Sequence, residues 1–529
     1  MKRSLSFLLV LCLLFGVTSL LGCPASSEGG GTTTTTKKTD TPAAPSEWAD
    51  TLDTEAVRAE IGGKTLTVSV FEAYDYEIYA EEDSKDALDQ LIYKRNKKIE
   101  ERFGVTVTPD TTKMTGDSDH WSQYYYVRDE LRSMAPEFDL VAMMAYVSGQ
   151  LITQKYYRDF RASIPYVRES LAAEDPWWPV AMNRNSTVCG RQFVAVSDMC
   201  ITLIDMSYAI ILNETLEAQY KVAEQYGEAC EEKWQTMYDI VESGAWTLDA
   251  LMTVTKDFWV DNPDLGTPGR VDAEDVIGLY NAGHTELDNY TWACGFRYIE
   301  NDGISEPTVF AVSSTFDTMV STLRSFFEDN NGVTLGALGL TEDGRKESFA
   351  SGHFLLMTGK LFFLKEPIIK GMEHNYGVLP YPKLNAEQGE YLTGTLDNIT
   401  VLSVPRYTAG KQLKLTGALT VALSAETRRS VNETYYEMII KHDSGFVNRA
   451  AVDMLDKIME GRVFDLAIYH YEELKFDTVN SYGSLGLYLR YLVQERAGKS
   501  YTASGLWSSI GDVMQGKMRD LIRAYAEIK

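Results

Sequence analysis

The stretch Lys64-Thr65-Leu66-Thr67-Val68-Ser69-Val70 places apolar side chains at alternate positions, which is typical of a β-strand. Apolar residues then recur at helical spacing from about Ser84, and Gly104 is placed where a helix would stop. Val105-Thr106-Val107 indicates a second strand. A strand, a helix and a strand in this order make a βαβ unit, so the sequence predicts an α/β fold built on parallel strands.

Other segments extend this α/β pattern. Phe138 to Met144 is an apolar run of the kind that forms a strand buried on both faces, and Tyr376 to Pro380 indicates a strand that ends at a proline. Pro367 to Met372 is expected to be a short helix with proline at its first position, whereas Leu361 to Leu364 is too short to assign. The later part of the chain is expected to be mostly helical, over 416–424, 431–441, 450–459 and 510–528.

Length and charge exclude some classes of function. The 529 residues are more than one hydrophobic core usually fills, which favours two or three domains. The 76 acidic residues outnumber the 50 Lys and Arg residues, so the net charge is −26 at neutral pH. Nucleic acid is not expected as a partner, because its affinity for proteins comes mainly from cationic side chains.

The first residues resemble an export signal of the lipoprotein type. Met1-Lys2-Arg3 is a positive start, Leu5 to Val17 is apolar but too short to span a bilayer, and Leu20-Leu21-Gly22-Cys23 resembles the bacterial lipobox. We expect 1–22 to be a signal peptide and Cys23 to be lipidated; an ordinary secretory signal is the alternative. Residues 23–46 have almost no apolar content, so we expect a disordered tether that holds the protein at the outer face of the cell membrane.

Export also bears on the four remaining cysteines, Cys189, Cys200, Cys230 and Cys294. They allow three pairings, and the sequence does not choose among them. A Cys189–Cys200 bridge is one possibility, because an apolar segment between the two could fold back as a hairpin. Four unpaired thiols are at least as compatible with the sequence.

The usual signatures of catalysis are absent from the sequence. It has no His-Glu-x-x-His, Gly-x-Ser-x-Gly, P-loop or Gly-x-Gly-x-x-Gly motif, and no cofactor is expected. The segment from Asp261 to Gly266, followed by Asp272 and Asp275, departs from the calcium-loop spacing, so a polar turn is favoured and bound calcium is left open. Two carboxylates suffice for a glycosidase, but with this many acidic residues some pair is always available.

Aromatic residues give a more specific indication. Many of them fall in segments expected to be loops or element ends, where a ring offers a flat apolar face and, in Tyr and Trp, a polar group. A sugar has an apolar C–H face surrounded by hydroxyl groups, so rings together with Asp and Asn suit carbohydrate. The residues concerned are Tyr74, Trp121, Tyr124, Tyr125, Tyr126, Trp177, Trp178, Trp246, Trp259, Tyr290 and Trp292.

Five segments, taken in order, resemble the extracellular solute-binding lipoproteins of ABC transporters, in the sugar-binding family 1 and its clostridial-type members. Their order over most of the chain makes the combination more specific than any one of them. They are Asn96 to Val107, Pro176 to Trp178 with Gly190 to Asp198, Gly244 to Asp249, Tyr376 to Lys383, and Met454 to Leu466.

The resemblance implies a type II periplasmic-binding-protein-like fold, with two α/β lobes joined by a hinge and a helical C-terminal part. The lobes are expected at 62–195 with 384–435, and at 205–378 with 436–529. The first crossing between lobes would lie near Val194 to Tyr208 and the second near Leu379 to Lys383. By the same resemblance the solute binds between the lobes, which close on it by hinge motion, and the partner is an ABC permease.

The candidate ligand-binding residues follow from position, because loops at the carboxyl ends of strands line such clefts. Tyr74 and Asp75 follow the first strand, Ser197 and Asp198 lie near the first crossing, and Asp397 and Asn398 follow the second. Candidates for stacking on a sugar are Trp178, Trp246 and Trp292.

The function expected on this basis is the capture of a carbohydrate by a lipid-anchored monomer that is not an enzyme. Among carbohydrates, an oligosaccharide is favoured. A receptor for a peptide or another polar solute is the alternative within the same class, although the negative charge gives it no support. A surface glycoside hydrolase is the alternative from the enzyme class.

Overall fold

The first sheet is built around the predicted βαβ unit. The computed structural model describes residues 50–112, 121–336, 338–442, 445–479, 483–495 and 502–528. Strands β1 (Thr65–Phe71) and β2 (Thr106–Thr112) are parallel neighbours, and α2 (Ala87–Phe103) connects them. The helix begins after Ser84 because the Asp86 side chain caps it by accepting the N–H groups of Leu88 and Asp89, and it ends at Gly104, whose φ is 67°.

Two further strands complete this sheet, in the order β13-β3-β1-β2. β3 (Leu140–Met144) is parallel to β1 and buried along its whole length, as predicted, and β13 (Thr400–Ser403) is antiparallel to β3. We call this sheet and the helices around it the first lobe. The helices are α1 (Thr54–Ile61), α2, α3 (Ser122–Ser133), α4 (Ala145–Thr153), α5 (Val167–Ala172) and α16 (Gly410–Glu426).

The second sheet mixes parallel and antiparallel strands in the order β11-β4-β10-β6-β5, with β9 beside β6. Strands β6, β9 and β10 are parallel, so their carboxyl ends lie at one edge. The predicted strand near Tyr376 and the short helix at Pro367 are confirmed, and Leu361 to Leu364 lies in a 3₁₀ helix. The strands are β4 (Tyr208–Asn213), β5 (Trp259–Val260), β6 (Val276–Asn281), β9 (Val333–Leu335), β10 (Phe354–Lys360) and β11 (Tyr376–Leu379).

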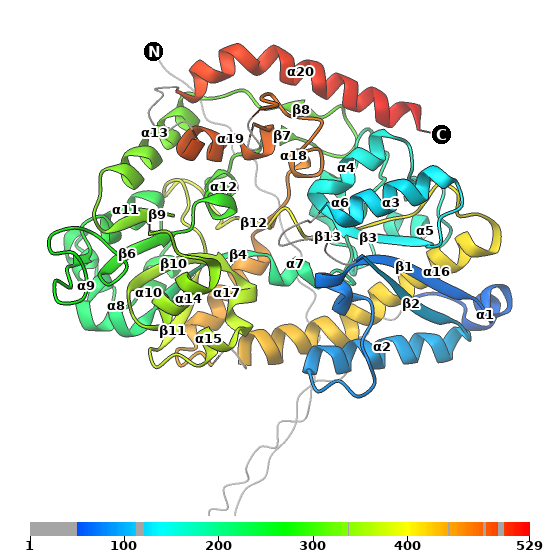
Figure 1. Ribbon diagram of the computed structural model, residues 1–529, viewed down its shortest axis with the longest axis horizontal. Coiled ribbons are helices and arrows are strands. Elements are labelled where there is room, and N and C mark those ends of the chain that lie inside the picture. The colour runs from blue at the N-terminus through cyan, green and yellow to red at the C-terminus, as the bar shows by residue number, and fades with distance from the viewer. Residues whose placement is uncertain are drawn as a thin grey trace, which may run out of the picture. The chain divides into compact units, whose positions relative to one another are not determined.

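We call this sheet and the helices around it the second lobe. Its helices are α8 (Glu214–Tyr220), α9 (Val222–Ala229), α10 (Met237–Glu242), α11 (Leu248–Thr255), α12 (His284–Ala293), α13 (Ser314–Glu328), α14 (Glu342–Ala350), α15 (Pro367–Lys370) and α17 (Ala450–Glu460), with the 3₁₀ helix η2 (Leu361–Lys365). Figure 1 places the two sheets in different halves of the described part of the chain, with β1 to β3 on one side and β4, β6 and β10 on the other.

The chain crosses between the two sheets at three places. The first crossing runs from Ala195, which pairs with Leu402 of β13, to Tyr208 at the start of β4, and it contains α7 (Thr202–Asp205). The second lies later than Leu379 to Lys383, because Lys383 still pairs with Thr247 of the second lobe. It runs from Thr395, which pairs with Ser207, to β13. The third is the continuation of α16 through the π-helical turns η3 (Thr427–Asn432) and η4 (Tyr435–His442) toward α17.

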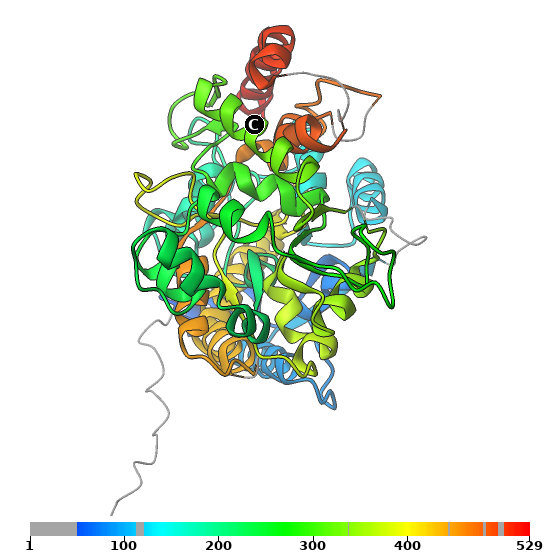
Figure 2. The same cartoon turned by 90° about the vertical axis from the view of Figure 1, so that its left-hand side faces the viewer.

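The last part of the chain is helical, as predicted. Helix α20 (Ala503–Glu527) packs against α4 of the first lobe and α13 of the second, and it lies at one end of the described part of the chain in both views (Figures 1 and 2). No helix among the described residues is long and apolar enough to cross a membrane. The remaining elements are α6 (Val180–Asn185), α18 (Leu466–Tyr469), α19 (Tyr488–Arg490), η5 (Leu485–Leu487), η6 (Tyr491–Glu495), β7 (Ile299–Glu300), β8 (Thr308–Val309), β12 (Thr393–Gly394) and β14 (Arg462–Val463).

Two open questions from the sequence are resolved here. All four described cysteines are free thiols, so the Cys189–Cys200 bridge does not form. The apolar segment between them does not fold back on itself, because Ala195 pairs with Leu402 instead. The segment after Asp261 is a polar turn in which carboxylates accept backbone N–H groups, that of Gly269 on Asp261 and that of Asn262 on Asp275. The predicted signal peptide, Cys23 and the tether lie outside the described residues.

Candidate functional site

The carboxyl ends of the parallel strands in the second lobe open onto a cavity of about 320 Å³. Ligands of open α/β sheets usually bind at this edge, because loops with free side chains follow the strands there. Strand β6 ends before Gly283, whose φ is 81° and whose Cα faces the Gln494 side chain so closely that a Cβ would lie 2.8 Å from it. The cavity is lined by Tyr280, Ala282, His284, Thr285, Glu286, Gly336, Leu340, Glu342, Arg345, Lys360 and Gln494.

A buried ion pair forms one wall of this cavity. The Arg345 guanidinium lies 3.0 Å from the Glu286 carboxylate and 3.2 Å from that of Glu342, while the Arg345 and Glu286 side chains are only 6% and 4% exposed. Burial acts to raise the pKa of Glu286, but the charges of Arg345 and then Lys360 outweigh it and hold that pKa below its usual value. The wall is therefore charged, and its cation is fixed in place.

Several polar atoms around this cavity have no hydrogen-bond partner among the described residues. The buried Nε and Nη1 of Arg345 are unpaired donors, and the Oε1 of Gln494 is an unpaired acceptor. At the end of β6, the Nδ2 of Asn281 is also unpaired, although its Oδ1 accepts the N–H of Gly283 at 2.9 Å. A buried donor left without a partner costs about 1–3 kcal/mol, so these atoms need a partner from outside the chain, either a water molecule or a ligand.

Aromatic rings gather at the corresponding edge of the first lobe. Trp121, at the start of α3, packs edge-on against Tyr124 and Tyr146, with ring centroids 5.3 and 5.9 Å apart. Tyr146 lies in the first turn of α4, directly after the carboxyl end of β3. Trp121 and Tyr146 are only partly buried, so part of their surface is available to a ligand.

The second crossing joins these two groups of residues. The backbone carbonyl of Asp397 accepts the N–H of Tyr146 at 3.1 Å, which ties the crossing to the first lobe. Burial, with the charges of Glu77 and Asp397, raises the pKa of Tyr74. Burial, with the charges of Glu286 and Asp397, also raises the pKa of Tyr208. Asp397 therefore lies between the Tyr74 side of the first lobe and the Glu286 wall of the second.

A buried carboxylate makes direct contacts with both lobes nearby. Asp205 of α7 is fully buried and accepts hydrogen bonds from the Tyr435 hydroxyl and, at 3.0 Å, from that of Tyr76 in the first lobe. Its second-lobe partner is Lys365, whose Nζ lies 2.9 Å from Oδ2. We call Asp205, Tyr76, Lys365 and Tyr435 the interlobe cluster, since it links the lobes through the first crossing.

Next to this cluster, Glu77 holds the 3₁₀ helix η1 (Glu72–Glu77) to the first crossing and to the end of the second. Its carboxylate accepts the N–H of Thr202 at 2.6 Å and the hydroxyl of Thr400, and it is fully buried. Burial raises the pKa of Glu77 to about 7, and these hydrogen bonds only partly oppose the rise.

This shift predicts a pH dependence of stability. The native state keeps the Glu77 proton up to a pH of about 7, whereas the unfolded chain releases it near pH 4.3. The free energy of unfolding is therefore expected to fall as pH rises between these values, the reverse of an ion-paired carboxylate. Glu77→Gln, which mimics the protonated acid, should flatten that fall in urea unfolding at pH 5, 6 and 7.5. An equally steep fall in the variant would contradict the assignment.

The structure brings four of the predicted site residues together near the second crossing. Tyr74 lies in η1 and is buried, and Asp75 next to it is half-buried, which raises the pKa of its carboxyl. Asp397 lies between the lobes as described above. Asn398 follows it, and its Oδ1 is buried without a hydrogen-bond partner.

Ser197 and Asp198 lie elsewhere, against the end of the long helix α16. The Ser197 hydroxyl is bonded to that of Ser424 at 2.8 Å, and the Asp198 carboxylate pairs with Arg428 at 2.9 Å. Asp198 lines a second cavity that shares no residue with the first.

The three predicted stacking residues belong to the core. Trp178, Trp246 and Trp292 are at most 3% exposed, and their indole N–H groups donate to Ser170, Pro380 and Asp465 respectively. Their indole N–H groups are therefore satisfied within the protein, and Trp178 in addition lines a third cavity beside α6 and residues 302–304.

Arg345, Glu286 and Gln494 were not predicted as site residues. Arg345 and Glu286 come from segments that look like ordinary polar helices, and Gln494 lies more than 140 residues further along the chain. The only sequence signal that could have found them is the position of Glu286 just after the apolar strand β6.

Comparison with known proteins identifies the fold. No protein-family model matches the sequence, and no curated protein does either. A sugar transporter from Rhizobium etli, solved in an open conformation, superposes with a TM-score of 0.52 at 10% identity, over 88% of this chain and all of the other. The chain has the two-lobe fold of periplasmic binding proteins.

Other solved structures cover a similar share of the chain at a lower TM-score. Maltose-bound MalE3 of T. maritima gives 0.48 at 11% identity, over 88% of this chain and all of the other. An ABC transporter solute-binding protein of Thermotoga lettingae, bound with α-D-tagatose, gives 0.49 at 12% identity, over 87% of this chain and all of the other.

Proposed function

We propose that the chain captures a carbohydrate between its two lobes and releases it chemically unchanged. The observation that carries this proposal is the set of unpaired buried atoms on the second-lobe cavity, namely the two Arg345 donors and the Gln494 acceptor. A sugar hydroxyl both donates and accepts a hydrogen bond, so one ligand rich in hydroxyl groups satisfies both kinds of atom.

The first lobe supplies the complementary surface. The partly exposed rings of Trp121 and Tyr146 suit the apolar C–H face of a sugar ring, and Asp397 and Asn398 supply acceptors at the crossing. Closure of the lobes would exclude water and strengthen each of these hydrogen bonds. Because the hydrogen-bonding groups lie in the second lobe and the aromatic rings in the first, an extended ligand that reaches both, such as an oligosaccharide, fits better than a single small solute.

The remaining parts of the proposal concern location and partners. The Gly22-Cys23 pair and the polar residues 23–46 support a lipid anchor and a tether on the outer face of the membrane. A two-lobe binding protein that does not alter its ligand needs a partner that takes the ligand over, and we propose an ABC permease in that role. We propose that the protein works as a monomer.

Thermal unfolding against a panel of ligands tests the function. A ligand at 100 times its Kd stabilises the native state by about 2.7 kcal/mol, so a bound sugar should raise the Tm clearly. The panel should include maltose, maltotriose, raffinose and tagatose, with short peptides as controls. A Tm raised only by peptides would favour a peptide receptor, and new reducing ends after incubation with an oligosaccharide would favour a glycoside hydrolase.

A further inference from the structure

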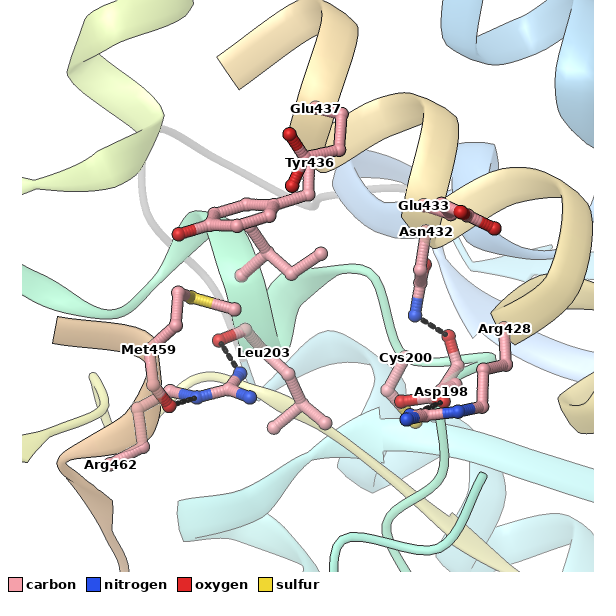
Figure 3. Close-up of a pocket in the computed structure, with 11 residues that line it drawn as sticks. Asp198, Cys200, Leu203, Arg428, Asn432, Glu433, Tyr436, Glu437, Met459 and Arg462 are labelled. Atoms are coloured by element: carbon pink, nitrogen blue, oxygen red, sulfur yellow. Dashed lines mark hydrogen bonds and ion pairs between the residues drawn. The ribbon is translucent and has the colours of Figure 1, made fainter. Parts of the chain in front are cut away.

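A second cavity, of about 350 Å³, lies between the first and the third crossing (Figure 3). Its walls come from the first crossing, from the turns η3 and η4 that continue α16, and from the end of α17 in the second lobe. None of its residues lines the cavity at Arg345. The lining residues are Asp198, Cys200, Leu203, Ile204, Arg428, Asn432, Glu433, Tyr436, Glu437, Met459 and Arg462.

One cation on this cavity has no counter-ion. The Arg462 guanidinium donates to the backbone carbonyls of Met459 at 3.0 Å and Leu203 at 2.9 Å, and in the described part of the chain no carboxylate lies within ion-pair distance of it. Burial lowers the pKa of Arg462. The Arg462 side chain is half-buried, and the charge of Asp198 acts on it only from beyond ion-pair distance. An anion placed beside the guanidinium would offset the remaining cost of its burial.

The second arginine that lines the cavity does have a counter-ion. Arg428 faces Arg462 across the hollow, but its charge is matched by the Asp198 carboxylate at 2.9 Å (Figure 3). Asn432 donates to the Asp198 carbonyl at 3.0 Å and keeps a buried Oδ1 without a partner. Two further carboxylates line the cavity, those of Glu433 and Glu437; both residues are exposed, and Glu437 pairs with Lys441 at 2.9 Å. Arg462 is the lining cation that has no carboxylate within ion-pair distance among the described residues.

Part of the surface between these walls is apolar. The side chains of Leu203 and Met459 and the ring of Tyr436 border the hollow, and the Tyr436 hydroxyl is engaged with Asp456 at 3.1 Å, away from the cavity. A ligand that fills this space needs an apolar body as well as one anionic group. Inorganic anions lack the apolar body, and neutral sugars lack the anionic group.

We propose that this cavity is a binding site for a small monocarboxylate with an apolar body, with the carboxylate at Arg462. Arg428 and Asn432 belong to the helix that packs on the first lobe, whereas Met459 and Arg462 belong to the second. A ligand that contacts both sides stabilises the lobe arrangement seen here. An effect of this ligand on sugar binding rests on the proposed function, whereas the existence of the carboxylate site does not.

The test is titration of the full soluble chain with 3-phenylpropionate in the absence of sugar, followed by calorimetry or ligand-observed NMR. The matched neutral probe is 3-phenylpropanamide, which keeps the body and removes the charge. A charge-assisted hydrogen bond is worth about 1.5–3 kcal/mol, which corresponds to roughly 10- to 100-fold in Kd, so the amide should bind at least tenfold more weakly.

Two variants locate the site. Arg462→Gln, whose amide can still donate to a carbonyl, should weaken phenylpropionate at least tenfold, whereas Arg270→Gln, at an exposed loop arginine, should leave the Kd unchanged. If Arg462→Gln does not fold, the comparison of the acid and the amide on the native chain still tests whether the cavity binds a carboxylate. Equal binding of the two probes, binding of neither, or wild-type affinity in a folded Arg462→Gln protein would overturn the proposal. Sugar binding plays no part in these readouts.

Discussion

Arg345→Met is expected to abolish carbohydrate binding and to lower the free energy of unfolding by about 3–5 kcal/mol. The loss of binding follows from the removal of the two unpaired donors that line the second-lobe cavity. The loss of stability follows because Glu286, whose side chain is 4% exposed, would keep its charge without the guanidinium 3.0 Å away. Calorimetry with the sugar panel and urea unfolding measure the two effects separately.

A double variant separates the two effects. Arg345→Met with Glu286→Gln removes the buried charge together with its partner, so most of the stability should return. Binding should stay lost, because the amide does not replace the Arg345 donors. A double variant that binds sugar as the native protein does would show that Arg345 acts only through stability, and would remove it from the site.

The second large effect is expected at the interlobe cluster. Lys365→Met leaves the fully buried Asp205 with hydroxyl donors but without its cation at 2.9 Å, so we expect the free energy of unfolding to fall by about 3–5 kcal/mol. Since Tyr76 belongs to the first lobe and Lys365 to the second, the radius of gyration should also rise as the lobes become less constrained. Urea unfolding and small-angle scattering measure these changes.

An exposed ion pair supplies the control for this variant. Lys221 lies 3.1 Å from Glu224 with side chains 66% and 46% exposed, so Lys221→Met should change the free energy of unfolding by less than about 1 kcal/mol. The double variant Lys365→Met with Asp205→Asn should regain much of the lost stability. Unchanged scattering and stability in Lys365→Met would mean that the cluster does not link the lobes.

The βαβ unit and the buried strands could be predicted because their signals are local. Alternating side chains in Thr65–Phe71, a capping aspartate, Gly104 at a positive φ and an uninterrupted apolar run at Leu140–Met144 each determine a short segment by themselves. The second crossing was predicted too early because Pro380 and Pro382 mark a chain boundary without saying which lobe follows. Lys383 still pairs with Thr247 of the second lobe.

The candidate site could be predicted only in part, since burial depends on the whole fold. Asp397 and Asn398 were chosen because they follow the predicted second crossing, and in the structure they lie within it, between Thr395 and β13. Arg345 could not be predicted, because an arginine in a polar helix is usually exposed, and the packing of α14 against α15 and β10 buries it. Trp178 shows the opposite error: its loop position suggested a free ring, but Ser170 accepts its indole N–H within the core.

The central claim is that a neutral, hydroxyl-rich ligand binds between the lobes and leaves intact. Equilibrium dialysis against a mixture of oligosaccharides, with mass spectrometry of the retained fraction, tests it most directly on the native chain and on Arg345→Met/Glu286→Gln. We expect the native protein to retain at least one sugar at unchanged mass and the double variant to retain none. Retention of cleavage products, equal retention by both proteins, or no retention by the native chain would contradict the claim.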